Sequence, residues 1–449
     1  MAREGIGVKR TSCIVMLGWM SSLSCGQEDR APKVMVQSHE TVVEDVMQEP
    51  GVVSETAEDV VLVPKAVLEI PQKASPRCEP REGAHPTSHS LMAQEAFQKG
   101  HFEQAIACSQ VALEKDWNSV PAMHIEGASF AALGEWGHAK DSFAGALALD
   151  PNDPETLAAV SEFYLNMLLP KKRRTIKMGL EYAKRGIAFA KLKESVDERL
   201  LDRLELLVAE AYNDLGEAEK AREKSRRVVL RRPRWPSALH ELAMSSFGLS
   251  DLKAAENEFE RVLKTDPLHG YAAHFLAIIK ERNGKSVEAL ALYEKANSIE
   301  PEVFSKPYSV DRTDFENEVE SALKELPKKY IEQLPYVEVR AVDYPDIDDL
   351  LGNGTPLSPT ILGLFRGDAL NEDSMGQTIQ NSIPTKNELD DAPTAKASKR
   401  SILIYRFNLC RVSKDRDELN QRIRRTIAHE WGHLNGLTES ELARIEGHR

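Results

Sequence analysis

The residues of this chain that are best suited to chemistry lie near its carboxyl end. His429 and His433 are four positions apart, so on a helix both imidazoles project from one face and can reach the same metal ion. Glu430 lies beside them, where a carboxylate can hold and deprotonate a water bound to the metal. Two histidines and a glutamate in this order therefore point to metal-assisted hydrolysis.

The residues that follow predict how a third ligand reaches the metal. Gly436 suits the end of a helix, because glycine turns the backbone through positive φ without a Cβ clash. The turn can carry Glu439 back to the two histidines, and three protein ligands with a water are what a catalytic zinc requires. Glu441 is the alternative third ligand, followed by Glu446 and His448.

Two helices are expected among the elements that position these residues. Residues 417–435 should form the helix that carries the motif, with Leu419, Ile423 and Ile427 spaced to face a core. Residues 314–326 have the pattern of an amphipathic helix, and a proline follows them.

Short strands are predicted between these helices, at 336–339, 361–365 and 401–407. Residues 371–399 are polar and lack a period, so we expect a long loop there. The order of helix, strands and helix predicts a small α+β domain over 308–449.

Residues 314–446 resemble the small bacterial zincin-like metallopeptidases, compact domains built around H-E-x-x-H-x-x-G-x-x-D. Further residues fall in the family's order: Phe315, Val319, Leu326-Pro327, Val337-Glu338-Val339, Asp343, Pro345, Leu362-Gly363-Leu364-Phe365, Gly367 and Ile404-Tyr405-Arg406. The resemblance implies zinc as the cofactor, His429 and His433 as ligands, and Glu430 as general base. The third-ligand position, commonly aspartate, is Glu439 here, which keeps a carboxylate and adds a methylene.

The resemblance also implies a substrate and a reaction. Zincins hold an extended peptide by backbone pairing with an edge strand beside the active-site helix, and either 361–365 or 401–407 is expected to supply that strand. Glu430 would take a proton as water attacks the peptide carbonyl and pass it to the leaving amine. The candidates for a further donor to the oxyanion, each with a structural role as the alternative, are Tyr405, Arg406 and His448.

A repeat occupies the middle of the chain. Four segments of the chain can be aligned on a glycine, and each then has an alanine five residues later. The glycines are Gly100, Gly134, Gly216 and Gly284, and the alanines are Ala105, Ala139, Ala221 and Ala289. Pro233, Pro267 and Pro301 close units at a spacing of 34 residues. This pattern resembles the tetratricopeptide repeat, whose antiparallel helix pairs stack on one another. We expect an all-α solenoid over 86–303, with six units that begin near Pro86, Val120, Pro154, Asp202, Pro236 and Gly270.

The third unit departs from this pattern. Its first helix is expected to end near Pro170, and a basic stretch, residues 171–174, comes before the pattern resumes at Leu180. Such a cluster is most often a solvated loop, and a partner-binding surface is the alternative. Repeat arrays present a face to other proteins, so the solenoid predicts recruitment of a protein partner or substrate, or else a spacer for the C-terminal domain.

The first residues resemble a bacterial export signal. Basic residues precede a short apolar run from Cys13 to Met20, and small residues follow up to Cys25. The pattern predicts a signal peptide over 1–25 with a lipid anchor on Cys25, and hence a periplasmic or membrane-anchored protein; a cytoplasmic location is the alternative. Residues 26–85 are acidic and without a period, which is typical of a disordered tether.

The composition narrows the choice of function. A net charge of −13 leaves no cluster of Lys and Arg able to neutralise phosphates, which argues against nucleic-acid binding. The five cysteines are too widely spaced for a disulfide framework or a cysteine metal site, and one bridge is left open. We therefore expect an exported zinc metallopeptidase with a recruiting array. The alternative is a repeat scaffold that binds metal or peptide but cleaves little, and the intact Glu430 favours the enzyme.

Overall fold

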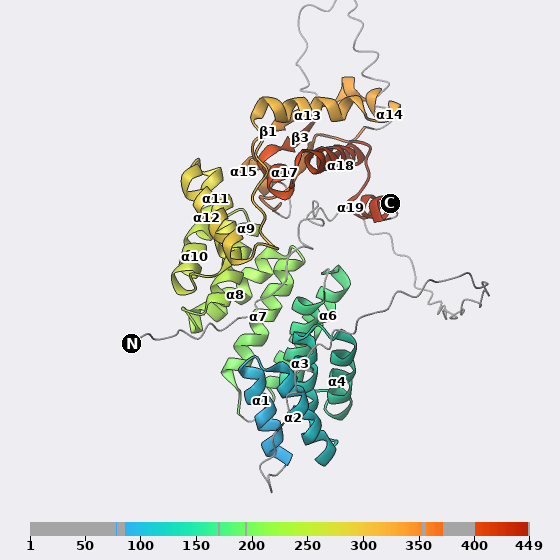
Figure 1. The fold of residues 1–449 in the computed structure, drawn as a ribbon. Coiled ribbons are helices and arrows are strands. Elements are labelled where there is room, and N and C mark those ends of the chain that lie inside the picture. The colour runs from blue at the N-terminus through green and yellow to red at the C-terminus, as the bar shows by residue number, and fades with distance from the viewer. Residues whose placement is uncertain are drawn as a thin grey trace, which may run out of the picture.

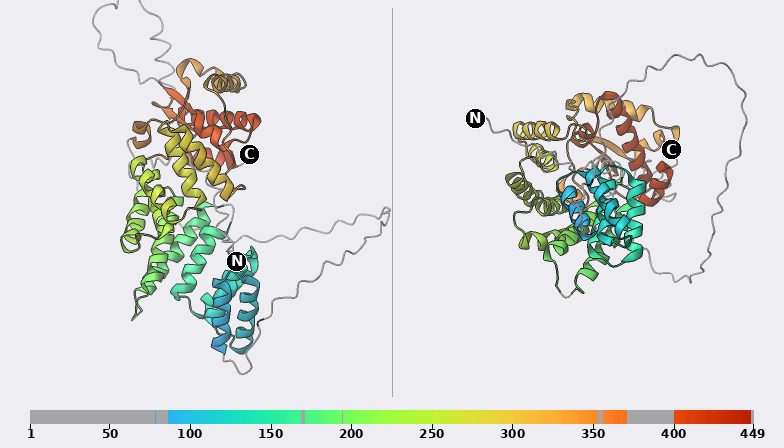
Figure 2. Two further views of the ribbon diagram at one scale, coloured as in Figure 1. Left: turned by 60° about the vertical axis from the view of Figure 1, so that its left-hand side comes forward. Right: turned by 60° about the horizontal axis from the view of Figure 1, so that its bottom comes forward.

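The computed structural model describes Cys78 and residues 86–168, 171–193, 195–352, 356–370 and 400–447. The expected signal peptide, the rest of the expected tether and the expected loop at 371–399 lie outside these ranges. The described chain forms a helical array followed by a smaller α+β part (Figure 1). The left view in Figure 2 shows the smaller part, in orange and red, beside the yellow helices at the carboxyl-terminal end of the array. Every described helix is too short or too polar to span a membrane.

The array consists of six antiparallel helix pairs, in agreement with the repeat pattern. Small residues let the two helices of a pair approach closely, and the alanines at these positions are buried. The pairs are α1 (Pro86–Gln98) with α2 (Phe102–Lys115), α3 (Val120–Ala132) with α4 (Trp136–Leu149), α5 (Pro154–Glu162) with α6 (Arg173–Ala190), α7 (Glu198–Asp214) with α8 (Ala218–Arg231), α9 (Pro236–Gly248) with α10 (Leu252–Thr265), and α11 (Gly270–Arg282) with α12 (Ser286–Ile299).

The turn inside most pairs needs a left-handed backbone conformation. Glycine supplies it without a Cβ clash in four pairs, at φ of 75° to 79°: Gly100, Gly134, Gly216 and Gly284. In the fifth pair Ser250 takes this position at φ 58°, the one residue other than glycine with positive φ in the described chain. Its hydroxyl donates to the carbonyl of Leu357 in the α+β part, at 3.2 Å. Serine adopts this left-handed conformation less readily than glycine, and it is found where the array contacts the α+β part.

The third pair contains the predicted irregularity. A π-helix, Phe163–Met167, extends α5. Lys171 is not in a solvated loop as predicted, because its Nζ lies buried between Asp214, at 2.7 Å, and Glu210, at 3.4 Å, both on α7. Burial alone lowers the pKa of Lys171, but the two carboxylates outweigh it and raise the pKa. A buried ion pair thus fastens the insertion to the array.

One disulfide joins the described residue ahead of the array to the first helix pair. Cys78 is bonded to Cys108 of α2, and Cys410 is a buried free thiol. The bond links residues 30 positions apart, which reduces the entropy of the unfolded chain. Among the three described cysteines this is the one bridge, a possibility that the cysteine spacing left open.

The α+β part contains a three-stranded mixed sheet in the order β1-β3-β2. β1 (Glu338–Val342) is parallel to β3 (Ser401–Tyr405), and β2 (Gly363–Arg366) is antiparallel to it. Of the two strands proposed as the edge, β2 therefore lies at the edge, and the expectation for 401–407 is wrong because β3 is central. That strand also ends earlier than predicted, since a helix begins at Arg406.

Helices enclose the core of this part. α13 (Arg312–Lys324) and α18 (Arg416–Leu434) pack with the sheet, and α17 (Arg406–Val412) packs with α18. The predicted inward face of α18 is confirmed, because Leu419, Ile423 and Ile427 are fully buried in one core with Phe315. The shorter elements, which the sequence did not reveal, are α14 (Lys328–Ile331), a 3-10 helix (Leu334–Tyr336), α15 (Ile347–Leu351) and α19 (Glu439–Gly447).

A buried arginine joins the two parts of the chain. The guanidinium of Arg411 on α17 donates to the Tyr293 hydroxyl of α12 at 3.0 Å and to Glu281 of α11 at 2.5 Å. It also donates to the side-chain oxygen of Asn408 at 2.8 Å. Because α17 leads directly into α18, the last helix pair of the array is fastened to the helix that carries the two histidines.

Replacing Arg411 with leucine should weaken this junction. The substitution leaves the partly buried Glu281 without its charged partner, which costs up to about 3–5 kcal/mol. The control is Arg312→Leu, which breaks an exposed pair with Glu316 and should change stability little. The free energy of unfolding in urea measures both variants, and equal losses would contradict the role given to Arg411.

Candidate metal centre

Helix α18 positions His429, Glu430 and His433. The helix starts where the Asp415 carboxylate accepts the backbone N–H of Glu418, and its apolar face is held in the core. The buried Trp431 donates from Nε1 to Gln333 Oε1 at 2.6 Å, which fixes the rotation of the last turns. The two histidines therefore share another face of the helix, with ring centres 5.0 Å apart.

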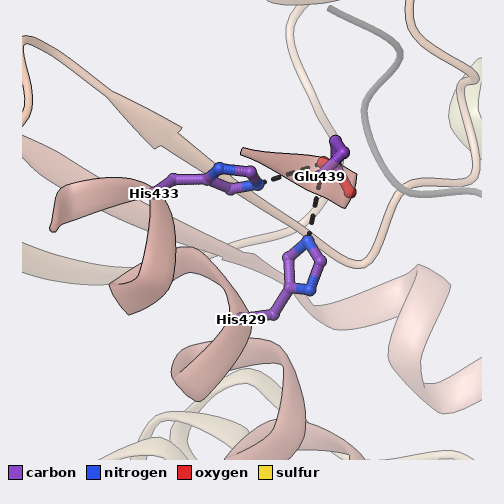
Figure 3. Close-up of side chains that lie close together, drawn as sticks. All are labelled: His429, His433 and Glu439. Carbon is purple, nitrogen blue, oxygen red and sulfur yellow. Dashed lines mark hydrogen bonds and ion pairs between the residues drawn. The ribbon is translucent and has the colours of Figure 1, made fainter. Parts of the chain in front are cut away.

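A turn and a second helix bring Glu439 to the histidines. Gly436 has φ of 77°, as its place in the sequence predicts. A Cβ on Gly432 would lie 2.3 Å from Leu442 Cδ2, so glycine there lets α19 pack directly on α18. Glu439 is the first residue of α19, and Figure 3 shows its carboxylate directed toward both imidazoles.

The three side chains fit a tetrahedral metal ion. Glu439 Oε1 lies 3.0 Å from His433 Nε2 and 3.6 Å from His429 Nε2. Ligands about 2.0–2.1 Å from a tetrahedral zinc are about 3.3 Å apart, a value between these two distances. Among the described residues, these three form the group of His, Cys, Asp and Glu side chains that could hold an ion.

Hydrogen bonding prepares His433 to act as a ligand. Its Nδ1 lies 3.0 Å from the Leu437 carbonyl, which can only accept, so Nδ1 carries the proton and Nε2 faces Glu439. Burial lowers the pKa of His433, but the bond to Glu439 and the nearby carboxylate charges outweigh it, and the pKa is raised. The site therefore favours positive charge at Nε2, from a proton or from a metal ion.

Glu430 is the buried carboxylate of this centre. Its Oε2 accepts the backbone N–H of Phe365 in β2 at 2.8 Å, and the residue is 7% exposed. Gly363 permits this approach, because a Cβ there would lie 2.6 Å from Thr426 Cγ2 and 3.1 Å from Glu430 Cγ. Burial raises the pKa of Glu430, although the two histidines and the Phe365 N–H act against it. A carboxyl group with a raised pKa is suited to accepting and releasing a proton.

The alternative third ligand, Glu441, has a different partner. Its Oε2 accepts the backbone N–H of Thr438 at 2.8 Å and the Thr438 hydroxyl at 2.7 Å. This is the reciprocal bond of a helix cap at the start of α19, and it lowers the pKa of Glu441. The structure thus brings Glu439 to the histidines and keeps Glu441 at the helix end.

The predicted oxyanion donors are not brought to the centre. Tyr405 is fully buried in a cluster with Leu350 and Ile361, where a substrate cannot reach it. Arg406 donates to Asp343 and to a backbone carbonyl at the start of the α+β part. His448 and the side chain of Glu446 lie outside the described residues.

Two contacts of the centre were not found by sequence reasoning. The Phe365 N–H is a backbone donor, and a residue pattern does not show where it points. Gly432 lies between the two histidines, where the motif allows any residue, and only its contact with Leu442 explains it. A glycine inside a predicted helix was the available indication of such a close approach.

One family of known proteins matches the C-terminal part. The family model of zincin-like metallopeptidases matches residues 334–448, which contain His429, Glu430, His433 and Glu439. Together with the six helix pairs, this match shows a tetratricopeptide-repeat array joined to a C-terminal zincin-like metallopeptidase domain. A family of this kind implies a bound metal.

Other comparisons add structures with limited likeness. PilW, described as a widely conserved type IV pilus biogenesis factor, is 18% identical, covers 48% of this chain and 94% of its own, and has a TM-score of 0.41. PilF of Pseudomonas aeruginosa is 14% identical, with coverages of 48% and 92% and a TM-score of 0.40. A tetratricopeptide repeat protein of Parabacteroides merdae is 15% identical, with coverages of 49% and 81% and a TM-score of 0.38. No curated protein matches the chain.

Replacing Glu439 with glutamine should remove zinc from the protein. An amide oxygen is a poorer ligand than a carboxylate, so a wild-type content of about one zinc per chain should fall to a small fraction. Glu441→Gln is the matched control, since it changes a carboxylate two residues away that caps α19. Zinc is measured by atomic absorption after gel filtration. Loss of zinc in the control with retention in Glu439→Gln would reverse the assignment.

Proposed function

We propose that this protein is a zinc-dependent metallopeptidase that hydrolyses peptide bonds and recruits a protein through its repeat array. The observation that carries the proposal is the convergence of three ligand atoms beside a buried carboxylate. His429, His433 and Glu439 can hold one ion, and Glu430 is fixed next to them by a backbone bond from the edge strand. A site that only binds metal has no need of Glu430.

The chemistry divides between the metal and the chain. Zinc, when bound, supplies a Lewis acid that lowers the pKa of water and polarises a carbonyl. Glu430 takes the proton from the attacking water and delivers it to the leaving amine nitrogen. The Phe365 N–H holds one oxygen of that carboxylate, which fixes the direction in which the other oxygen can receive the proton.

The edge strand indicates how a peptide would bind. β2 pairs with β3 on one side only, and the Phe365 N–H points away from β3 toward Glu430. An extended peptide that pairs with the remaining outward backbone groups of β2, with the Phe365 N–H still bonded to Glu430, would therefore lie beside Glu430 and the metal ligands. This arrangement favours unfolded segments, because only an extended backbone can add to a strand.

A repeat scaffold with a binding domain of little activity is the second candidate. The placement of Tyr405 and Arg406 favours it, since neither predicted oxyanion donor reaches the centre. Such a protein would hold zinc and extended peptides without cleaving them. Both candidate functions require bound zinc, and they differ in whether the bound peptide is cleaved.

We further propose that the protein is exported and that Cys25 carries the lipid anchor. The support comes from the apolar run that precedes Cys25 and from the disulfide between Cys78 and Cys108. Disulfides persist in oxidising compartments such as the periplasm and are rare in the cytosol.

Replacing Glu430 with glutamine should slow cleavage strongly and leave zinc in place. Loss of the proton carrier lowers kcat by about 10²–10⁴-fold, measured on an unfolded protein such as casein. Glu418→Gln on the same helix, where the carboxylate pairs with Arg422, should retain activity. A zinc-loaded wild-type protein that cleaves neither casein nor short peptides would instead support the scaffold.

The mass of the mature protein tests the location. Export as a lipoprotein should remove the residues before Cys25 and add lipid to that cysteine, so a bacterial expression host should yield a shorter, acylated chain in its membrane fraction. Cys25→Ser should prevent both changes. An unprocessed amino terminus in the wild-type protein would refute the proposal.

A further inference from the structure

Helix α6 has a basic face, although the protein as a whole carries a net charge of −13. From its first residues to its end, the exposed positions are cationic except for Glu181 and Ala188. Glu181 is paired with Lys184 at 3.1 Å. The exposed cations are Lys172, Arg173, Arg174, Lys177, Lys184 and Arg185.

The cations at the start of α6 are not neutralised by the array. Arg173, Arg174 and Lys177 make no ion pair with any residue in the described ranges. Helix α8 is just as rich in Lys and Arg, but most of its cations, all except Arg226, have partners among the described residues of the array: Lys220 with Glu217, Arg222 with Asp251, Lys224 and Arg227 with Glu223, and Arg231 with Asp202. The basic face of α6 is therefore suited to binding an acidic group that the described part of the chain does not supply.

An open hollow of about 620 Å³ runs along this face. Met178 and Tyr182 line it together with Arg173, Lys177 and Arg185. Apolar side chains between cations suit an extended segment in which acidic and aliphatic residues alternate. Its carboxylates can meet the guanidinium groups while its aliphatic side chains cover the methionine and the tyrosine.

The chain itself contains such a segment. Residues 40–59 include no Lys or Arg and have valines at 42, 43, 46, 52 and 53. Their seven carboxylates are Glu40, Glu44, Asp45, Glu49, Glu55, Glu58 and Asp59. Residue 59 is 19 positions before Cys78, which the disulfide fixes to α2. That length spans up to about 65 Å, and the four helix spacings from α2 to α6 amount to about 40 Å.

We propose that the acidic segment 40–59 binds to the basic face of α6. The covalent link makes this occupant favourable, because two binding partners joined in one chain meet at an effective concentration of about 1 mM. A dissociation constant of about 0.3 mM then keeps the segment bound about three quarters of the time. An acidic segment of another protein would have to bind much more tightly to displace it. The contact holds the amino-terminal part of the chain against the third helix pair.

Proteolysis of the full chain tests the proposal. A glutamate-specific protease cuts the segment only when it is released, so a bound fraction of three quarters gives about fourfold protection. Reversing three charges on α6, with Arg173→Glu, Arg174→Glu and Lys177→Glu, should remove the protection, as should about 1 M salt for the wild-type protein. The control reverses three charges on α8, with Lys220→Glu, Arg226→Glu and Arg227→Glu, and should be cut at the wild-type rate. Equal rates in all three proteins would overturn the proposal.

Photocrosslinking keeps the proposal testable if the reversed α6 fails to fold. A benzophenone amino acid in place of Met178 leaves all the cations of α6 intact. On irradiation it should form crosslinks to residues 40–59 of the same chain, which mass spectrometry locates. Crosslinks confined to other parts of the chain, or formed only between chains, would overturn the proposal. Neither readout depends on zinc or on peptidase activity.

Discussion

The contact of α18 with the edge strand β2 is the constraint on which the metal centre depends. At Gly363 the strand comes so close to Thr426 and Glu430 that no Cβ has room. This contact sets the position of α18 on the sheet and brings the Phe365 N–H to the Glu430 carboxylate. Behind α18, the buried Trp431 and its bond to Gln333 hold the helix against the strand. Beyond its end, Gly432 gives α19 the space to return with Glu439.

Much of this centre could be predicted because it is local in sequence. His429, Glu430 and His433 lie within one helical turn or so, and Gly436 predicts the turn that returns Glu439. The Phe365 bond joins residues 65 positions apart, and no local pattern encodes it. The run 401–407 has strand composition throughout, yet α17 begins at Arg406, and the side chains of Arg406 and Arg411 bind distant residues that a local pattern does not contain. The repeat was predictable because identical spacings recur, whereas the buried place of Lys171 depends on carboxylates about forty residues later.

Buried cations hold the two irregular points of the molecule. Lys171 fixes the insertion of the third pair between Glu210 and Asp214, and Arg411 fixes the α+β part to Glu281 and Tyr293. Taking a charge out of water is costly, and the attraction of its partners does little more than offset that cost. Such pairs therefore fix the relative positions of the elements they join more than they add net stability. Arg411 in this way fixes the angle between the array and α18, the helix that carries the two histidines.

The junction also limits how a protein of this type can change its length. Solenoids grow or shrink by whole units, since each unit touches only its neighbours. Here the fifth pair contributes Ser250 and the sixth contributes Glu281 and Tyr293 to contacts with the α+β part. A unit gained or lost next to the junction would separate these residues from their partners. Units gained or lost farther from the junction leave these contacts in place, so the reach of the array could vary there while the surroundings of the metal centre stay the same.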